Sequence, residues 1–344
     1  MLGLLGLLAV LPIISACAGN KGSDESRKEK MVQSVSVVQP ITGTWINLAY
    51  KDVRNKYTNP QHFDNMDPKL WTAKVRELAN MGIEYLVFME VANEGKAYYP
   101  SKLMPWLYND KLQSPVDAIL DEAAKHGMKV FMSTGWAKDQ DDNLLDPVIK
   151  ERQLQIMEEL ASLYKNHKAF YGWYLPVEDC LCPIFAEHAV QSVNALTEKA
   201  HSLTPGKKTL ISPYGIGLSE FDHPDFEKQM AKLKVDIIAY QDEVGCVRDK
   251  FTLPRLKKNW QRMRDIHNRL NIEMWANCET FTWEEGTNDR QSALIPAAYS
   301  RLLSQQVAAS VAGVDKIISF MFGGIIEDPK SAYQLGQPVW LSLI

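Results

Sequence analysis

The sequence lacks the features that mark several large classes of protein. Its 344 residues carry 38 Lys and Arg against 42 Asp and Glu, so the formal charge is −4 and there is no basic excess of the kind that binds nucleic acid. With only 5 cysteines, a fold held together mainly by disulfides is excluded. Hydrophobic residues make up 46% and charged residues 23%, which is typical of a folded globular chain and excludes wholesale disorder.

Several catalytic and cofactor-binding motifs are also missing. No Gly-x-Gly-x-x-Gly follows the first apolar run of the body, which argues against a dinucleotide-binding domain. No Gly-x-Ser-x-Gly elbow is present, which argues against a serine hydrolase. The 7 histidines are scattered, without His-Glu-x-x-His. We therefore expect no cofactor and assign no metal site.

The N-terminus has the pattern of an export signal. Residues 1–16 are apolar but too short to span a bilayer, which takes about 20 residues. The residues Ile-Ser-Ala before Cys17 resemble a bacterial lipobox, in which the cysteine becomes the lipidated first residue, although no Lys or Arg precedes the apolar run. Residues 17–38 are polar and predict a solvated tether. We expect an exported protein that is anchored in the bacterial cell envelope through a lipid on Cys17, in the outer membrane and facing the periplasm or the surface, with a folded body over residues 39–344.

Short apolar runs alternate with helical stretches throughout the body. The runs cover residues 43–48, 85–89, 129–133, 169–175, 209–212, 236–240, 273–277 and 316–321. Continuous apolar runs are typical of parallel strands that are covered on both faces. Eight strands separated by helices predict a single α/β domain with a (β/α)8 TIM barrel. An open doubly wound sheet also alternates in this way and is left as the alternative.

The predicted helices carry their own boundary signals. Asp67, Ser114 and Asp146 each precede a proline, the combination of a capping residue and proline at the first helical position. Glycines at 82 and 127 mark the ends of the first two helices. Further helical periodicity covers residues 184–203, 224–233, 254–270 and 291–312.

Two glutamates follow predicted strands at positions that matter in this fold. The active sites of (β/α)8 barrels lie at the C-terminal ends of the strands. Glu178 follows the fourth strand and Glu279 the seventh. Glycosidic bond hydrolysis needs one protonated and one ionised carboxyl group, so we predict Glu178 as acid/base and Glu279 as nucleophile. The competing interpretation is that each carboxylate only braces a loop Lys or Arg.

Aromatic and polar residues near the same strand ends suit a sugar ligand, because the C–H faces of sugars stack on aromatic rings. Trp45, Trp136 and Trp283 are predicted walls of the site, whereas Trp173 and Trp275 lie within strands and are predicted core residues. The remaining predicted substrate-binding residues are Tyr99, Tyr214, Tyr240, Gln241 and Asp242. The expected partner is therefore an oligo- or polysaccharide, and no protein partner is inferred.

Four cysteines follow predicted strands at the same end of the barrel. They are Cys180, Cys182, Cys246 and Cys278. A C-x-C pair with two single cysteines lacks the two C-x₂₋₄-C knuckles of a structural zinc site. Disulfides, free thiols and a metal site all stay open, and the last of these keeps a metal-dependent hydrolase as a further alternative.

Four segments resemble a known bacterial family. They are residues 43–45, 95–101, 172–178 and 240–245. The family comprises uncharacterised (β/α)8-barrel proteins, proposed to be glycoside hydrolases and common among exported lipoproteins. The resemblance covers roughly residues 40–325 and implies a barrel with a carbohydrate-related role.

A wider resemblance is to the retaining glycosidase clan. Glu178 and Glu279 match its acid/base and nucleophile positions, but Val177 stands where that clan has an Asn that binds the sugar 2-hydroxyl. Gln241 or Asp242 are candidates to replace it. This departure leaves a second function open, a non-catalytic carbohydrate-binding lipoprotein with a degenerate barrel site.

Overall fold

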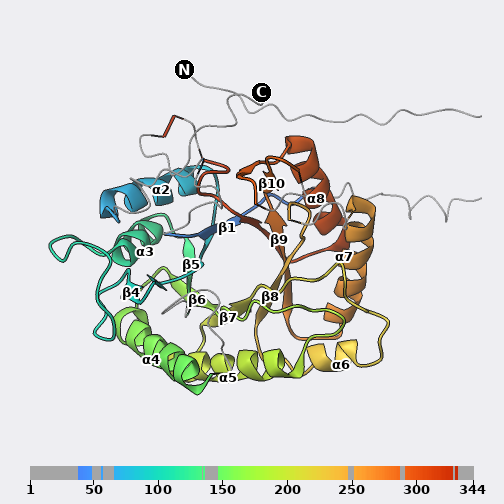
Figure 1. Cartoon of the computed structure of the whole chain (residues 1–344), viewed down its shortest axis with the longest axis horizontal. Coiled ribbons are helices and arrows are strands. Elements are labelled where there is room, and N and C mark those ends of the chain that lie inside the picture. The colour runs from blue at the N-terminus through green and yellow to red at the C-terminus, as the bar shows by residue number, and fades with distance from the viewer. Residues whose placement is uncertain are drawn as a thin grey trace, which may run out of the picture. The chain divides into compact units, whose positions relative to one another are not determined.

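The strands of the body form a closed parallel barrel (Figure 1). The computed structural model describes residues 38–48, 56, 66–133, 135, 146–246, 252–286, 291–327 and 330–331. Within these residues the strands follow one another around the barrel in chain order, and the last pairs with the first. They are β1 (Gly43–Ile46), β2 (Tyr85–Phe88), β5 (Lys129–Ser133), β6 (Phe170–Tyr174), β7 (Lys208–Ile211), β8 (Ile237–Gln241), β9 (Glu273–Glu279) and β12 (Lys316–Phe320). The predicted (β/α)8 barrel is confirmed, and the open sheet is excluded.

Helices surround this barrel (Figure 1). They are α2 (Pro68–Asn80), α3 (Pro115–Lys125), α4 (Pro147–Tyr164), α5 (Glu187–Leu203), α6 (Phe226–Met230), α7 (Leu253–His267) and α8 (Tyr299–Ala312). The three predicted caps are confirmed, because the side chains of Asp67, Ser114 and Asp146 each accept a hydrogen bond from a backbone N–H of the first turn.

Two predicted helices are wrong in extent. The helix predicted over residues 291–312 begins only at Tyr299, because Leu294–Pro296 forms strand β11, which pairs antiparallel with β10 (Phe281–Trp283). Pro296 also disfavours helical backbone at Ile295, the residue before it. The helix predicted over 224–233 is reduced to the short α6. A second small hairpin, β3 (Ala92–Asn93) with β4 (Lys96–Ala97), follows β2.

Large aromatic side chains fill both core layers. Inside the barrel, Trp275 packs edge to face with Tyr85 and Phe131, at centroid distances of 5.1 and 5.8 Å. Between the barrel and the helices, Trp173 is fully buried beside Phe170. The prediction that both tryptophans are core residues is confirmed. Burial of a large apolar side chain stabilises a fold by about 2–3 kcal/mol.

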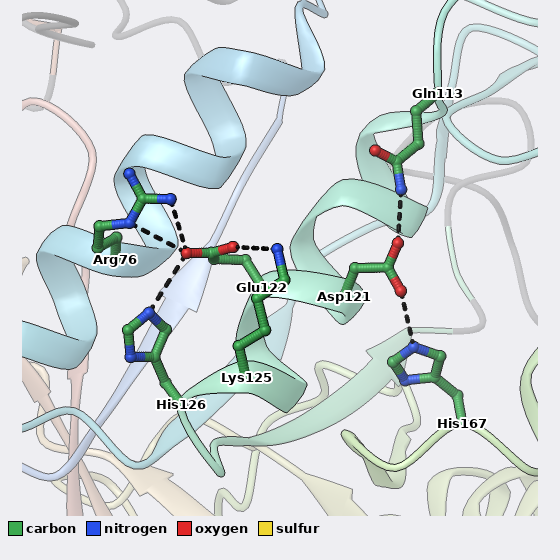
Figure 2. A network of polar contacts seen from close by, with 7 residues as sticks. All are labelled: Arg76, Gln113, Asp121, Glu122, Lys125, His126 and His167. Atoms are coloured by element: carbon green, nitrogen blue, oxygen red, sulfur yellow. Dashed lines mark hydrogen bonds and ion pairs between the residues drawn. The ribbon is translucent and has the colours of Figure 1, made fainter.

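A buried carboxylate joins α2 to α3. Glu122 is 2% exposed and accepts hydrogen bonds from Arg76 of α2 at 2.9 Å and from Lys125 at 2.8 Å, while His126 lies 3.3 Å away (Figure 2). Burial by itself raises the pKa of Glu122, but the hydrogen bonds from Lys125 and Arg76 outweigh it and the pKa is lowered. The carboxylate therefore stays ionised and holds the two helices together.

The predicted signal peptide, Cys17 and residues 17–37 of the tether lie outside the described residues, so the lipid anchor stays a prediction. Among the helices described, none is long and apolar enough to cross a membrane.

Candidate active site

Acidic side chains gather at the C-terminal ends of the barrel strands. Glu279 is the last residue of β9, Asp242 directly follows β8, and Glu178 lies in the segment after β6. All barrel strands are parallel, so their C-terminal ends lie at one end of the barrel. The structure therefore places Glu178 and Glu279 at the same end, as predicted, and adds Asp242 between them in the strand order.

Glu178 is exposed and is held by Gln241. Nε2 of Gln241, at the end of β8, donates to Oε1 of Glu178 at 2.7 Å and to the backbone oxygen of Ser212 at 3.0 Å. A neutral amide donor orients a carboxylate without cancelling its charge. Gln241, a predicted substrate-binding residue, is thus next to Glu178, and its described contacts position that carboxylate.

The segment that carries Glu178 is tied down just beyond it. Cys180 and Cys182 form a disulfide. The backbone N–H of Leu181 donates to the backbone oxygen of Tyr214 at 2.8 Å. The backbone N–H of Tyr214 in turn donates to the backbone oxygen of Asp179 at 3.3 Å. The loops after β6 and β7 are therefore joined directly.

The cysteines do not converge on one point. With Cys180 and Cys182 in the disulfide, Cys278 carries a free, buried thiol, and Cys246 is half-buried. In the part of the chain that the structure describes, no three His, Cys, Asp or Glu side chains are placed to hold a metal ion.

Glu279 lies in a nearly closed environment. It is 5% exposed, and its Oε2 accepts a hydrogen bond from the backbone N–H of Cys246 at 2.6 Å. Gly245 permits this approach, because a β-carbon there would lie 2.9 Å from that same oxygen. Burial, and then the neighbouring charge of Asp242, raise the pKa of Glu279 from 4.5 to about 8. Glu279 therefore holds a proton at neutral pH.

Asp242 is completely buried, at 0% exposure. It accepts hydrogen bonds from Nε2 of Gln305 at 2.6 Å, from the N–H of Glu279 at 3.1 Å and from the N–H of Val244 at 3.3 Å. Burial raises the pKa of Asp242 and the hydrogen bond from Gln305 opposes that rise. The prediction that Asp242 binds substrate is wrong, because no part of its side chain reaches the surface.

The prediction that two tyrosines, Tyr240 and Tyr99, bind substrate is also wrong. Tyr240 is buried and points out of the barrel toward α7, where its hydroxyl lies 2.7 Å from Nε2 of His267. Side chains alternate along a strand, so Gln241 faces the opposite way. Tyr99 is buried as well and donates to Glu159 of α4 at 2.8 Å. Both hydroxyls are used inside the fold.

The structure gives different outcomes for the three predicted tryptophan walls and for Tyr214. Trp45 is 3% exposed and packs inside the barrel, 4.6 Å from Tyr174 between ring centroids, so the prediction of an open wall there is wrong. Tyr214 is 39% exposed, and Trp283 on β10 is half-buried, with its indole N–H donating to the backbone oxygen of Cys246 at 3.4 Å. Trp136 lies outside the described residues.

Sequence reasoning missed an aromatic and a polar residue at this end of the barrel. Phe320, the last residue of β12, is half-buried, with its centroid 6.4 Å from Trp45 and 6.1 Å from Phe281. Asn277 accepts from the indole N–H of Trp45 at 3.1 Å and donates to Oγ of Ser212 at 3.1 Å. Strand alternation from Glu279 to Asn277 was the available signal for the second.

The sequence analysis also missed two polar residues of α8, Arg301 and Gln305. Both are buried and lie one turn apart on a helix face otherwise made of alanines 308, 309 and 312. Polar residues at i and i+4 on a buried face were the signal that could have found them.

The fold and its strand ends define the class: a parallel (β/α)8-barrel protein with a cluster of carboxyl groups at the C-terminal end of the barrel. Within this class the chain belongs to the family described as a domain of unknown function, DUF4434, whose family model matches residues 41–333. The family resemblance found in the sequence agrees with this membership in its barrel fold and in the part of the chain covered.

Among curated proteins, glycosyl hydrolase DigH of Escherichia coli strain K12 is 29% identical over 144 residues. That match covers 38% of this chain and 32% of DigH, so the chain matches about a third of the length of that relative.

Among solved structures, a proposed alpha-L-fucosidase from Bacteroides thetaiotaomicron superimposes with a TM-score of 0.66 at 22% identity, covering 86% of this chain and 91% of that one. A beta-galactosidase from Marinomonas ef1 gives 0.52 at 11% identity, covering 82% and 54%. At these identities the likeness concerns the fold.

Proposed function

We propose that the protein hydrolyses glycosidic bonds in an oligo- or polysaccharide, with Glu178 and Glu279 as its two reacting carboxyl groups. The observation that carries the proposal is the contrast between their surroundings. Glu178 is exposed and receives a hydrogen bond from a neutral amide, whereas Glu279 is nearly closed off from water and its pKa is raised to about 8. Glycoside hydrolysis needs one carboxyl group of each protonation state.

In this proposal Glu279 protonates the leaving-group oxygen. Glu178, in its ionised form, attacks the anomeric carbon or activates the water that does so. These roles are the reverse of those predicted from the sequence, because burial and Asp242 disfavour the charged form of Glu279. The exposed ring of Tyr214 and the half-buried ring of Trp283 are the proposed stacking surfaces for the sugar.

The comparisons support a carbohydrate substrate. DigH is named a glycosyl hydrolase, and the two structural neighbours are named as a proposed fucosidase and a galactosidase. Because one barrel fold hosts many chemistries, the proposal depends on the two glutamates rather than on the fold.

The test is release of sugar from a panel of aryl glycosides and polysaccharides by the unmodified protein and by Glu178→Gln and Glu279→Gln. Each variant is expected to lose a factor of about 10²–10⁴ in kcat, the size of a general acid or base contribution. Activity of the unmodified protein is also expected to fall as pH rises through about 8, where Glu279 loses its proton.

The matched control is Glu198→Gln, an exposed glutamate on α5 that pairs with Lys234 and is expected to keep full activity. Full activity in both active-site variants would reject the pair. Sugar binding by the unmodified protein without any released sugar would replace the proposal with a non-catalytic carbohydrate-binding role.

A further inference from the structure

Buried side chains hold both backbone groups of Glu279. On one side, Asp242 accepts the N–H of Glu279 at 3.1 Å. On the other, two residues of α8 donate to the backbone oxygen of Glu279, Arg301 at 2.7 Å and Gln305 at 3.1 Å. Arg301 also donates to the backbone oxygen of Phe281 at 2.7 Å. Hydrogen bonds with the residue after β8 and with α8 therefore fix the backbone at the end of β9.

These contacts form one connected set. Gln305 bonds through Nε2 both to Asp242, at 2.6 Å, and to the backbone oxygen of Glu279. Burying a guanidinium, an amide and a carboxylate together is costly, and apolar residues of similar size often replace such sets without loss of stability. Packing of α8 against the barrel therefore does not by itself account for them.

The carboxyl group of Asp242 accepts more hydrogen bonds than that of Glu279. Asp242 accepts hydrogen bonds from Gln305, Glu279 and Val244, whereas the charge of Arg301 favours the ionised form of both carboxyl groups. Among the described residues, the Glu279 carboxyl receives the single N–H of Cys246. More donors stabilise the charged form more, so Asp242 ionises first and the proton stays on Glu279.

Charged and titratable groups face Glu279 from three elements. They are Asp242, Glu243 and Cys246 after β8, Cys278 on β9 and Arg301 on α8. Of these, Asp242 contributes the largest charge effect on Glu279, and that of Glu243 is smaller. Glu243 accepts the N–H of Gly215 at 2.9 Å, in the loop after β7.

We propose that Asp242, held by Gln305, is the positioning residue for Glu279. Its carboxylate fixes the backbone at the end of β9, and its negative charge adds to the larger effect of burial in favouring the protonated form of Glu279. This rests on the proposed function for its catalytic meaning, but the contacts and the titration of Glu279 are independent of any substrate.

The test is the titration of the Glu279 carboxyl group, followed by NMR of the whole protein labelled with ¹³C at the glutamate δ-carbons. The signal is assigned by its disappearance in Glu279→Gln. The decisive variant is Asp242→Asn, which keeps an oxygen for the Glu279 N–H and removes the charge. The midpoint of Glu279 is expected near 8 in the unmodified protein and lower by at least about one pH unit in the variant.

The matched control is Glu243→Gln, which removes a charge from the adjacent residue and is expected to give a smaller decrease. Gln305→Leu tests the same proposal should Asp242→Asn not fold. Without its strongest donor Asp242 ionises less readily, so Glu279 is again expected to titrate at lower pH. A midpoint left unchanged by Asp242→Asn or by Gln305→Leu overturns the proposal, as does a larger decrease in Glu243→Gln.

In the pH–rate profile, the alkaline decline is expected to move down together with the Glu279 midpoint in Asp242→Asn. A purely structural role would lower the rate at every pH without moving this decline. If Glu178→Gln and Glu279→Gln stay fully active, the proposed hydrolysis fails, while the titration still decides whether Asp242 positions Glu279.

Discussion

Gln241, the last residue of β8, donates a hydrogen bond at 2.7 Å to Glu178 in the segment after β6. The same nitrogen donates to the backbone oxygen of Ser212, the residue after β7. The place of Glu178 is therefore set by two neighbouring strands as well as by its own loop, and this dependence can be measured.

Replacing Gln241 by leucine removes a hydrogen bond to a charged group, worth about 1.5–3 kcal/mol. We expect kcat/KM on a hydrolysed glycoside to fall by about 10- to 100-fold. The control is Gln113→Leu, which removes a hydrogen bond of the same kind, from Gln113 to Asp121 at 2.6 Å beside α3 (Figure 2). Equal losses in the two variants would show that the effect is not local to Glu178.

A buried histidine makes the stability of the barrel depend on pH. Nδ1 of His267 lies 2.9 Å from the backbone oxygen of Ile272, which can only accept, so Nδ1 carries the hydrogen and Nε2 accepts from the Tyr240 hydroxyl. Burial lowers the pKa of His267 from 6.5 to about 4. Between these values the unfolded chain binds the proton and the folded protein does not, so stability is lost as pH falls from 6.5 toward 4.

The expected loss from this histidine is about 3 kcal/mol in the free energy of unfolding, measured by urea denaturation at pH 7 and at pH 4. In His267→Gln this part of the pH dependence should vanish, whereas His188→Gln, on the exposed face of α5, should retain it. An unchanged pH dependence in His267→Gln would contradict the assignment.

Two glycines with similar backbone angles allow a matched test of the loop beside Glu178. Gly215 and Gly206 have φ values of +88° and +84°, a left-handed backbone that costs an alanine about 1–2 kcal/mol. A β-carbon at Gly215 would lie 2.5 Å from Sγ of Cys180, whereas at Gly206 it meets no atom within 4 Å. Gly215→Ala should therefore destabilise by about 1–3 kcal/mol more than Gly206→Ala in urea denaturation. Equal effects would mean that Cys180 can move aside freely.

The barrel was predictable because its signals are local. Strands covered on both faces require continuous apolar runs, and each predicted run supplies one barrel strand. Asp67, Ser114 and Asp146 cap helices through contacts two or three residues away. The prediction of a helix from residue 291 was wrong because its cause is not local. Strand β11 pairs with β10, which lies some 13 residues earlier in the chain.

The candidate site was predictable only in part. Topology brings strand ends together, so Glu178 and Glu279 could be paired from their positions alone. The direction of a side chain was harder to predict, because one residue of register decides between the barrel interior and the helix layer. Tyr240 and Gln241 are neighbours in sequence, yet one contacts α7 and the other contacts Glu178.

The amino-acid sequence by itself determined the barrel, most of its helices and the two glutamates at the strand ends, since periodicity, caps and chain order are properties of short segments. The tertiary structure alone decided that the pKa of Glu279 is raised to about 8. Protonation depends on water exclusion and on charges brought near by folding, here Asp242 and Arg301, which are 37 and 22 positions from Glu279 in the chain.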